Sequence, residues 1–163
     1  MDYIETFGDE KPDTGCFLCA YWSDPGQDAE HHVVWRRAGS FTFFNRYPYT
    51  NGHLLIAPAT HTAELDALSS ELMTELMEQV RDAQRLLAEV VRAEGLNVGM
   101  NFGRCAGAGV PDHLHIHAVP RWRGDTNFMS VLADARVMPQ DPDALYEKMA
   151  DAVGRLGLPA LPT

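Results

Sequence analysis

Polar and apolar residues alternate strictly through residues 113–118. Every second residue is a histidine, at His113, His115 and His117, and the residues between them are apolar. This period of two predicts a half-buried β-strand with the three histidines on one face. The outer two rings would lie about 13 Å apart along such a strand. One metal ion cannot bind both, so the spacing indicates divided roles for the three histidines.

Four earlier apolar segments are also typical of strands. Turn-forming residues separate them, and the first two are close enough to form a hairpin. The expected strands cover residues 33–36, 41–44, 53–57 and 96–102.

The period changes to three or four residues between 70 and 93, which predicts a long amphipathic helix. Ser69 or Ser70 can cap its start, and Gly95 lies just past its end. The helix needs no function beyond packing on the sheet.

A last helix is expected from Asp141 to about residue 156, because aspartate is a good N-cap and proline fits the first turn. The pattern predicts an α+β fold: an antiparallel sheet of about five strands with one long helix and a C-terminal helix. We expect a single domain over 1–163, with an N-terminal segment (1–30), a core (31–125) and a C-terminal extension (126–163).

Composition narrows the function classes. The formal net charge of −10 argues against a general nucleic-acid binder, which needs a basic surface. The acidic N-terminus has no apolar region typical of an export signal, and no apolar run approaches a membrane span. We therefore expect a cytoplasmic protein with neither a nucleic-acid nor a membrane partner.

Cys16 and Cys19 form a Cys-x-x-Cys pair in a short turn or knuckle. In a chain without an export signal this pattern indicates metal binding or redox chemistry. A structural zinc site needs four ligands, and reduced, uncoordinated thiols are the alternative. Cys105 is expected to be a small packed residue. The candidate partners for the cysteine pair are His31, His32, His53, His61 and the three alternating histidines.

The middle histidine, His115, is placed to act as a nucleophile. We expect an exposed imidazole, largely neutral at pH 7, whose second nitrogen is held by a neighbour. The glycine-rich loop 103–111 offers backbone N–H groups to phosphate oxygens. Together these features suggest attack on a phosphoryl group. A metalloenzyme that uses the three histidines directly as ligands is a rival hypothesis.

These residues resemble the histidine triad superfamily of nucleotidyl hydrolases and transferases. The signature is His-x-His-x-His followed by two apolar residues, and the likeness extends over about residues 33–125. Within the superfamily, the loop before the histidines and residues 117–128 look most like the diadenosine tetraphosphate phosphorylase group, in the fragile-histidine-triad branch.

The resemblance implies roles for individual residues. His115 would become nucleotidylated on the α-phosphate, His117 would contact phosphate and assist proton movement, and His53 would support it. Asn45 would bind the ribose hydroxyls and Asn101 the substrate. The backbone of the loop would hold the phosphate through Gly107, Ala108, Gly109 and Val110.

The resemblance also implies a structural zinc bound by Cys16, Cys19, His61 and His113, and a homodimer. The substrate would be a small nucleotide, a dinucleoside polyphosphate or a related adenylyl compound. Many relatives have Gly-Gln-Ser or Gly-Gln-Thr in the loop before the histidines, whereas this chain lacks the glutamine. This departure suggests phosphate rather than water as the second nucleophile. A nucleotide-binding regulatory module with little turnover is the alternative.

Overall fold

Five antiparallel strands form one sheet in the computed structural model, which describes residues 15–125 and 141–159. Their order across the sheet is β1-β2-β3-β5-β4, so the last strand in sequence lies between β3 and β4. This confirms the α+β fold expected from the sequence. The strands are β1 (Val33–Arg36), β2 (Ser40–Phe44), β3 (Leu54–Pro58), β4 (Gly95–Met100) and β5 (Ile116–Arg121).

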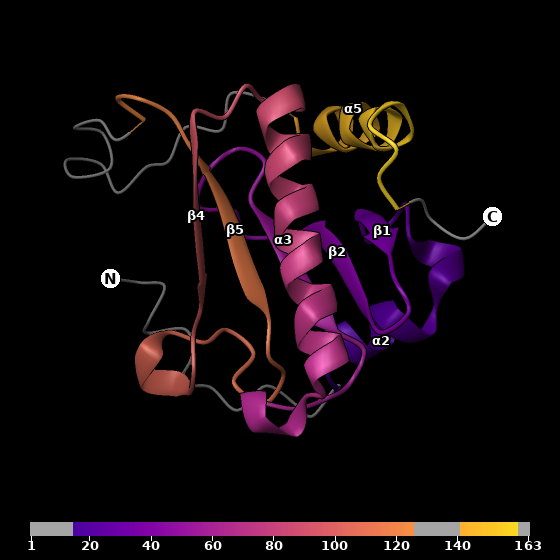
Figure 1. Cartoon of the computed structure of the whole chain (residues 1–163), viewed down its shortest axis with the longest axis vertical. Helices are drawn as coiled ribbons and strands as arrows, with labels where there is room; N and C mark the ends of the chain where they lie inside the picture. The colour runs from indigo at the N-terminus through magenta and orange to yellow at the C-terminus, as the bar shows by residue number, and fades with distance from the viewer. Residues whose placement is uncertain (1–14, 126–140, 160–163) are drawn as a thin grey trace.

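The long helix α3 crosses one face of the sheet, and α5 lies beside its C-terminal end (Figure 1). As expected, Ser69 caps α3 by accepting from the backbone N–H of Leu72, and Asp141 caps α5. The helices are α2 (Phe17–Ser23), α3 (Ser70–Val90) and α5 (Pro142–Arg155), with 3-10 turns η1 (Pro25–Gln27), η2 (Leu65–Ala67) and η3 (Arg104–Ala106).

Alternation along the strands divides the apolar side chains between two cores. In β3, Leu54 and Ile56 join the core under α3 and α5, whereas Leu55 and Ala57 join a second core on the opposite face. Leu18 of α2 is fully buried in the second core. Each buried Leu or Ile side chain contributes about 1.5–3 kcal/mol. The second face carries the candidate site.

Arg36 of β1 fixes the position of α2. Its guanidinium donates to the backbone carbonyls of Tyr21 (2.6 Å) and Trp22 (3.0 Å), at the end of α2. The same group forms a two-pronged ion pair with Asp28, and both side chains are less than 10% exposed. Because α2 carries Cys16 and Cys19, the buried ion pair between Arg36 and Asp28 helps to place the two thiols.

The strand expected over all three histidines is shorter than predicted, because β5 begins at Ile116. Continuing the β3–β5 register would place Pro58 opposite Leu114, and proline has no N–H for the ladder. The N–H of Leu114 donates instead to the carbonyl of Thr62 at 2.7 Å. The alternation nevertheless persists, and Leu114 is buried in the core under α3.

Two other local expectations are wrong. The long helix ends at Val90, and the residue with positive φ after it is Arg92 (φ 54°), whereas Gly95 already belongs to β4. The cysteine pair lies on a helix rather than in a turn, with Cys16 as N-cap of α2 and Cys19 in its first turns. Among the described residues, no helix is long and apolar enough to cross a membrane.

Candidate active site and metal centre

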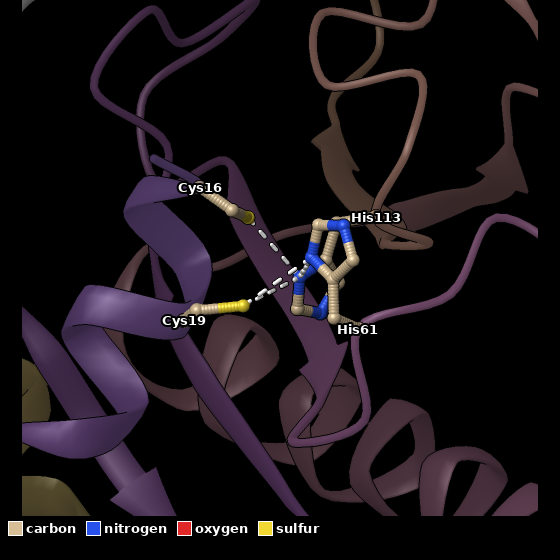
Figure 2. Close-up of side chains that lie close together, drawn as sticks. All are labelled: Cys16, Cys19, His61 and His113. Atoms are coloured by element: carbon tan, nitrogen blue, oxygen red, sulfur yellow. Dashed lines mark hydrogen bonds between the residues drawn. The ribbon is translucent and has the colours of Figure 1, made fainter. Parts of the chain in front are cut away.

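Four side chains from three parts of the chain converge at the N-terminal end of α2. They are Cys16 and Cys19 at that end of the helix, His61 after β3, and His113 before β5. Figure 2 shows both thiols pointing at the two imidazoles. Their possible ligand atoms all lie within 4.8 Å of one another. These are the four residues that the family resemblance implied.

The distances within this cluster match the edges of a zinc tetrahedron. Zn–S bonds of about 2.3 Å and Zn–N bonds of about 2.0–2.1 Å give S···N edges of about 3.6 Å and an N···N edge of about 3.3 Å. The Nδ1 of His113 lies 3.2 Å from Cys16 Sγ and 3.6 Å from Cys19 Sγ. The Nδ1 of His61 lies 3.3 Å from Cys19 Sγ and 3.2 Å from His113 Nδ1.

The protonation of His113 also suits a metal ligand. Its Nε2–H donates to the carbonyl of Pro58 at 2.9 Å, so the lone pair lies on Nδ1, which faces the thiols. Burial lowers the pKa of His113, which favours the neutral ring. Burial raises the pKa of Cys19, and the neighbouring Cys16 raises it further, so two thiolates at this spot require a cation.

The other candidate partners of the cysteine pair lie elsewhere. His31 stacks on Tyr21 with ring centroids 3.9 Å apart, and His32 pairs with Asp143. Within the part of the chain that the structure describes, the metal cluster takes only His113 from the three alternating histidines. This geometry gives no support to a metalloenzyme that uses all three. Cys105 is exposed, so the expectation that it is packed is wrong.

One ring nitrogen of His115 donates a hydrogen bond, and the other has a lone pair available to a ligand. Its Nδ1–H donates to the carbonyl of His113 at 2.9 Å, which leaves the lone pair on Nε2. The neighbour that holds its proton is therefore a backbone carbonyl. The sequence predicted an exposed ring, but His115 is only 6% exposed, with the ring of His117 beside it at a centroid distance of 5.0 Å. Burial lowers its pKa, which keeps the ring neutral.

His53 and His117 form a hydrogen-bonded pair of rings with defined tautomers. The backbone N–H of Tyr49 donates to His53 Nδ1 at 3.0 Å, and the side-chain amide of Asn45 lies 3.2 Å from the same atom. The proton of neutral His53 is therefore on Nε2, which lies 3.0 Å from His117 Nδ1. His117 must accept there, and its own proton is on Nε2.

The Nε2–H of His117 is a buried donor beside the ring of His115. The two ring centroids lie 5.0 Å apart. The His117 Nε2 atom has no hydrogen-bond partner among the described residues. Burial, and then the nearby His115, lower the pKa of His117 to about 4, so the ring is neutral at pH 7. A lone pair on one ring and an unpaired N–H on the next suit an anionic or electrophilic ligand.

The remaining predicted site residues lie around these rings. Asn45 accepts from the backbone N–H of Tyr47 and approaches His53, which leaves one amide proton and one lone pair for a ligand. Asn101 donates to the carbonyl of Gly107 at 3.4 Å and so helps to hold the glycine-rich loop. Gly107 has φ +83°, a conformation that suits glycine. Of its loop neighbours, Ala108 is buried, Gly109 is exposed and Val110 packs on the second core.

Sequence reasoning missed the backbone groups that set the tautomers. The carbonyls of Pro58 and His113 and the N–H of Tyr49 decide which nitrogen of each ring carries its proton. Backbone donors and acceptors are the same for every residue type except proline.

Comparison with known proteins points to one family. The HIT domain family matches residues 27–124. The AP-4-A phosphorylase of Mycobacterium tuberculosis is 41% identical over 113 residues, which are 69% of this chain and 58% of that protein. The asymmetrical bis(5'-nucleosyl)-tetraphosphatase of Schizosaccharomyces pombe is 34% identical over 93 residues, 57% of this chain and 50% of that protein. The matched part is thus little more than half of each of these curated relatives.

A solved structure has a similar fold over nearly its whole length. The zinc-bound histidine triad family protein of Mycobacterium smegmatis is 25% identical, with a TM-score of 0.71 over 90% of this chain and 98% of that one.

Proposed function

The chain belongs to the HIT domain family, and from this membership we propose that it is a nucleotidyl hydrolase or transferase for dinucleoside polyphosphates. The observation that carries this proposal is the available Nε2 lone pair of His115, beside the unpaired Nε2–H of His117. The names of the relatives from M. tuberculosis and S. pombe support a diadenosine tetraphosphate substrate.

In the first step, His115 Nε2 attacks the α-phosphorus of the bound nucleotide. A P–N bond forms and the P–O bond to the leaving nucleoside polyphosphate breaks. That group leaves as an anion and needs no proton at neutral pH. The positive charge on the His115 ring is stabilised by its Nδ1–H bond to the carbonyl of His113. The Nε2–H of His117 donates to a phosphoryl oxygen, as do backbone N–H groups of the glycine-rich loop.

In the second step, water or inorganic phosphate attacks the phosphorus and the P–N bond breaks. Water gives a nucleoside monophosphate, whereas phosphate gives a nucleoside diphosphate. We propose phosphate as the second nucleophile, because the loop has Gly107-Ala108-Gly109-Val110 where many relatives carry a glutamine. Asn45 and Asn101 contact the ribose and the phosphates in this proposal.

A product assay with diadenosine tetraphosphate tests both steps. We expect ADP and ATP when inorganic phosphate is present, and a nucleotidyl-enzyme on rapid quench when it is absent. AMP formation without phosphate would show hydrolysis instead. Tight binding of the nucleotide without turnover or a covalent intermediate would favour a regulatory nucleotide-binding module.

We also propose a structural zinc ion held by Cys16, Cys19, His61 and His113. The tetrahedral distances and the tautomer of His113 support it, as does the zinc-bound relative from M. smegmatis. Zinc would fix the end of α2 to the segment before β5, with all four positions filled by protein. Paired thiolate ligands suit a reducing compartment, which supports a cytoplasmic location. Metal analysis of the purified protein should give one zinc ion per chain.

A homodimer is the third part of the proposal. Strand β4 is at the edge of the sheet, and its Val98 is 45% exposed. Met73 and Met77, one turn apart on α3, are 41% and 56% exposed. Edge strands and exposed apolar side chains are typical of self-association surfaces. Val98→Lys should give a monomer in sedimentation, whereas Asp151→Lys on α5, on the other side of the molecule (Figure 1), should not.

A further inference from the structure

The ring of Tyr49 covers the pair formed by His53 and His117. It lies parallel to the His117 ring, with a centroid distance of 5.6 Å and an interplanar angle of 6°. It also lies 4.6 Å from the His53 ring. Tyr49 itself is 37% exposed, so one face of its ring contacts the histidine and part of it meets solvent. Offset parallel stacking of this kind restricts the rotation of the smaller ring.

Two hydrogen bonds of Thr50 hold the loop that carries Tyr49. The hydroxyl of Thr50 donates to the carbonyl of Pro120 in β5 at 3.2 Å, three residues beyond His117. The N–H of His53 donates to the carbonyl of Thr50 at 3.2 Å. The backbone next to Tyr49 is therefore tied to the two segments that carry His53 and His117.

We propose that Tyr49 is a positioning residue that holds the His117 ring with its Nε2–H directed beside His115. Its backbone N–H sets the tautomer of His53, and its ring prevents His117 from turning away from His53. The inference deepens the proposed nucleotidyl transfer and rests on it for its catalytic meaning. The orientation of the His117 ring can be measured on the protein without any nucleotide.

The physical need for such a residue follows from rotation of the imidazole about its Cβ–Cγ bond. A half-turn of the His117 ring would put carbon atoms where Nδ1 and Nε2 now lie, so Nδ1 would lose its bond to His53 Nε2 and the Nε2–H would no longer lie beside His115. The titratable rings that face His117 are His53 at the start of β3, His115 before β5 and Tyr49 itself. Leu55 and Gly99 flank it in the two ladders of the sheet. Stacking by Tyr49 adds a restraint on the plane of the His117 ring to the single hydrogen bond from His53.

The test compares Tyr49→Leu with Tyr49→Phe. Leucine keeps the backbone N–H but removes the aromatic face, whereas phenylalanine keeps that face and loses only the hydroxyl. Long-range ¹H–¹⁵N NMR spectra report the tautomer and the pKa of each histidine, and His117→Gln assigns the signal. We expect a single Nε2–H tautomer in the wild type and in Tyr49→Phe. In Tyr49→Leu we expect a mixture of tautomers and a higher pKa, since water reaches the ring.

Kinetics with diadenosine tetraphosphate provide a second measurement on the same variants. Loss of the stacking contact should lower kcat of Tyr49→Leu by on the order of threefold to tenfold, with KM within about twofold. Tyr49→Phe should keep the wild-type kcat. The inference is overturned if Tyr49→Leu is folded and has the wild-type tautomer, pKa and kcat. If the wild type turns over no nucleotide, the proposed function fails, while the NMR result still decides the role of Tyr49.

Discussion

The carbonyl of His113 accepts the Nδ1–H of His115 at 2.9 Å, while the ring of His113 faces the thiols of Cys16 and Cys19. One residue thus links the metal cluster to the imidazole that carries the available lone pair. A change in the position of His113 therefore alters the arrangement of the four metal-cluster residues. It also alters the hydrogen bond that keeps the proton of His115 on Nδ1.

Cys16→Ser should remove the metal and weaken the fold. Serine is a poor zinc ligand, and a structural metal contributes folding free energy directly. We expect loss of most bound zinc by elemental analysis and a fall in Tm of about 10 °C or more by calorimetry. Nucleotide turnover should also fall, because His113 is no longer held. Cys105→Ser is the matched control, since Cys105 is exposed and lies outside the cluster.

His115→Ala should abolish turnover and leave the metal in place. Removal of a nucleophile costs on the order of 10⁴-fold or more in kcat. The variant should still contain zinc, because the metal cluster does not include this ring. Wild-type turnover of diadenosine tetraphosphate, or loss of zinc from the variant, would contradict the roles assigned here. Rapid-quench analysis should find no nucleotidyl-enzyme.

Acid should destabilise the protein partly through His117. Its pKa is about 4 in the folded chain and near 6.5 when unfolded. Above pH 6.5 the ring is neutral in both states. As the pH falls from 6.5 to 4, the unfolded chain takes up a proton that the folded chain does not, so the free energy of unfolding falls.

Urea unfolding of the wild type and of His117→Gln at several pH values between 7 and 4 checks this prediction. The metal ligands and the histidines that do not contact His117 are common to both proteins, so their contributions largely cancel in the comparison. The variant should lose less stability than the wild type over this range. An equal loss in both proteins would show that His117 titrates normally in the folded chain.

Asp28→Asn should destabilise the chain by about 3 kcal/mol. The substitution leaves the guanidinium of Arg36 buried without its counter-charge, and breaking a buried ion pair from one side is strongly destabilising. Because Arg36 also holds the end of α2, we expect weaker zinc binding. Asp24→Asn is a suitable control, since Asp24 is exposed. Equal midpoints of the two variants in urea would contradict the prediction.

The sequence by itself determined the sheet, the long helix and the C-terminal helix. The alternation at Leu54, Leu55 and Ile56 fixes which face of β3 meets which core, and the capping residues Ser69 and Asp141 mark helix starts. These are local properties, so they can be read from neighbouring residues. The spacing of the three alternating histidines also predicted divided roles for them, and this stays a prediction.

The tertiary structure decided which groups meet. Residue spacing could not select His61 over His31 or His32 as a partner for the cysteines, because that choice depends on where the chain after β3 passes α2. Nor could it give the tautomers of the four rings, because these depend on backbone groups that only the folded chain brings to His113, His115 and His53, and on the contact between the His53 and His117 rings. Contacts between residues far apart in sequence depend on chain reversal and packing, and side-chain pattern does not encode them locally.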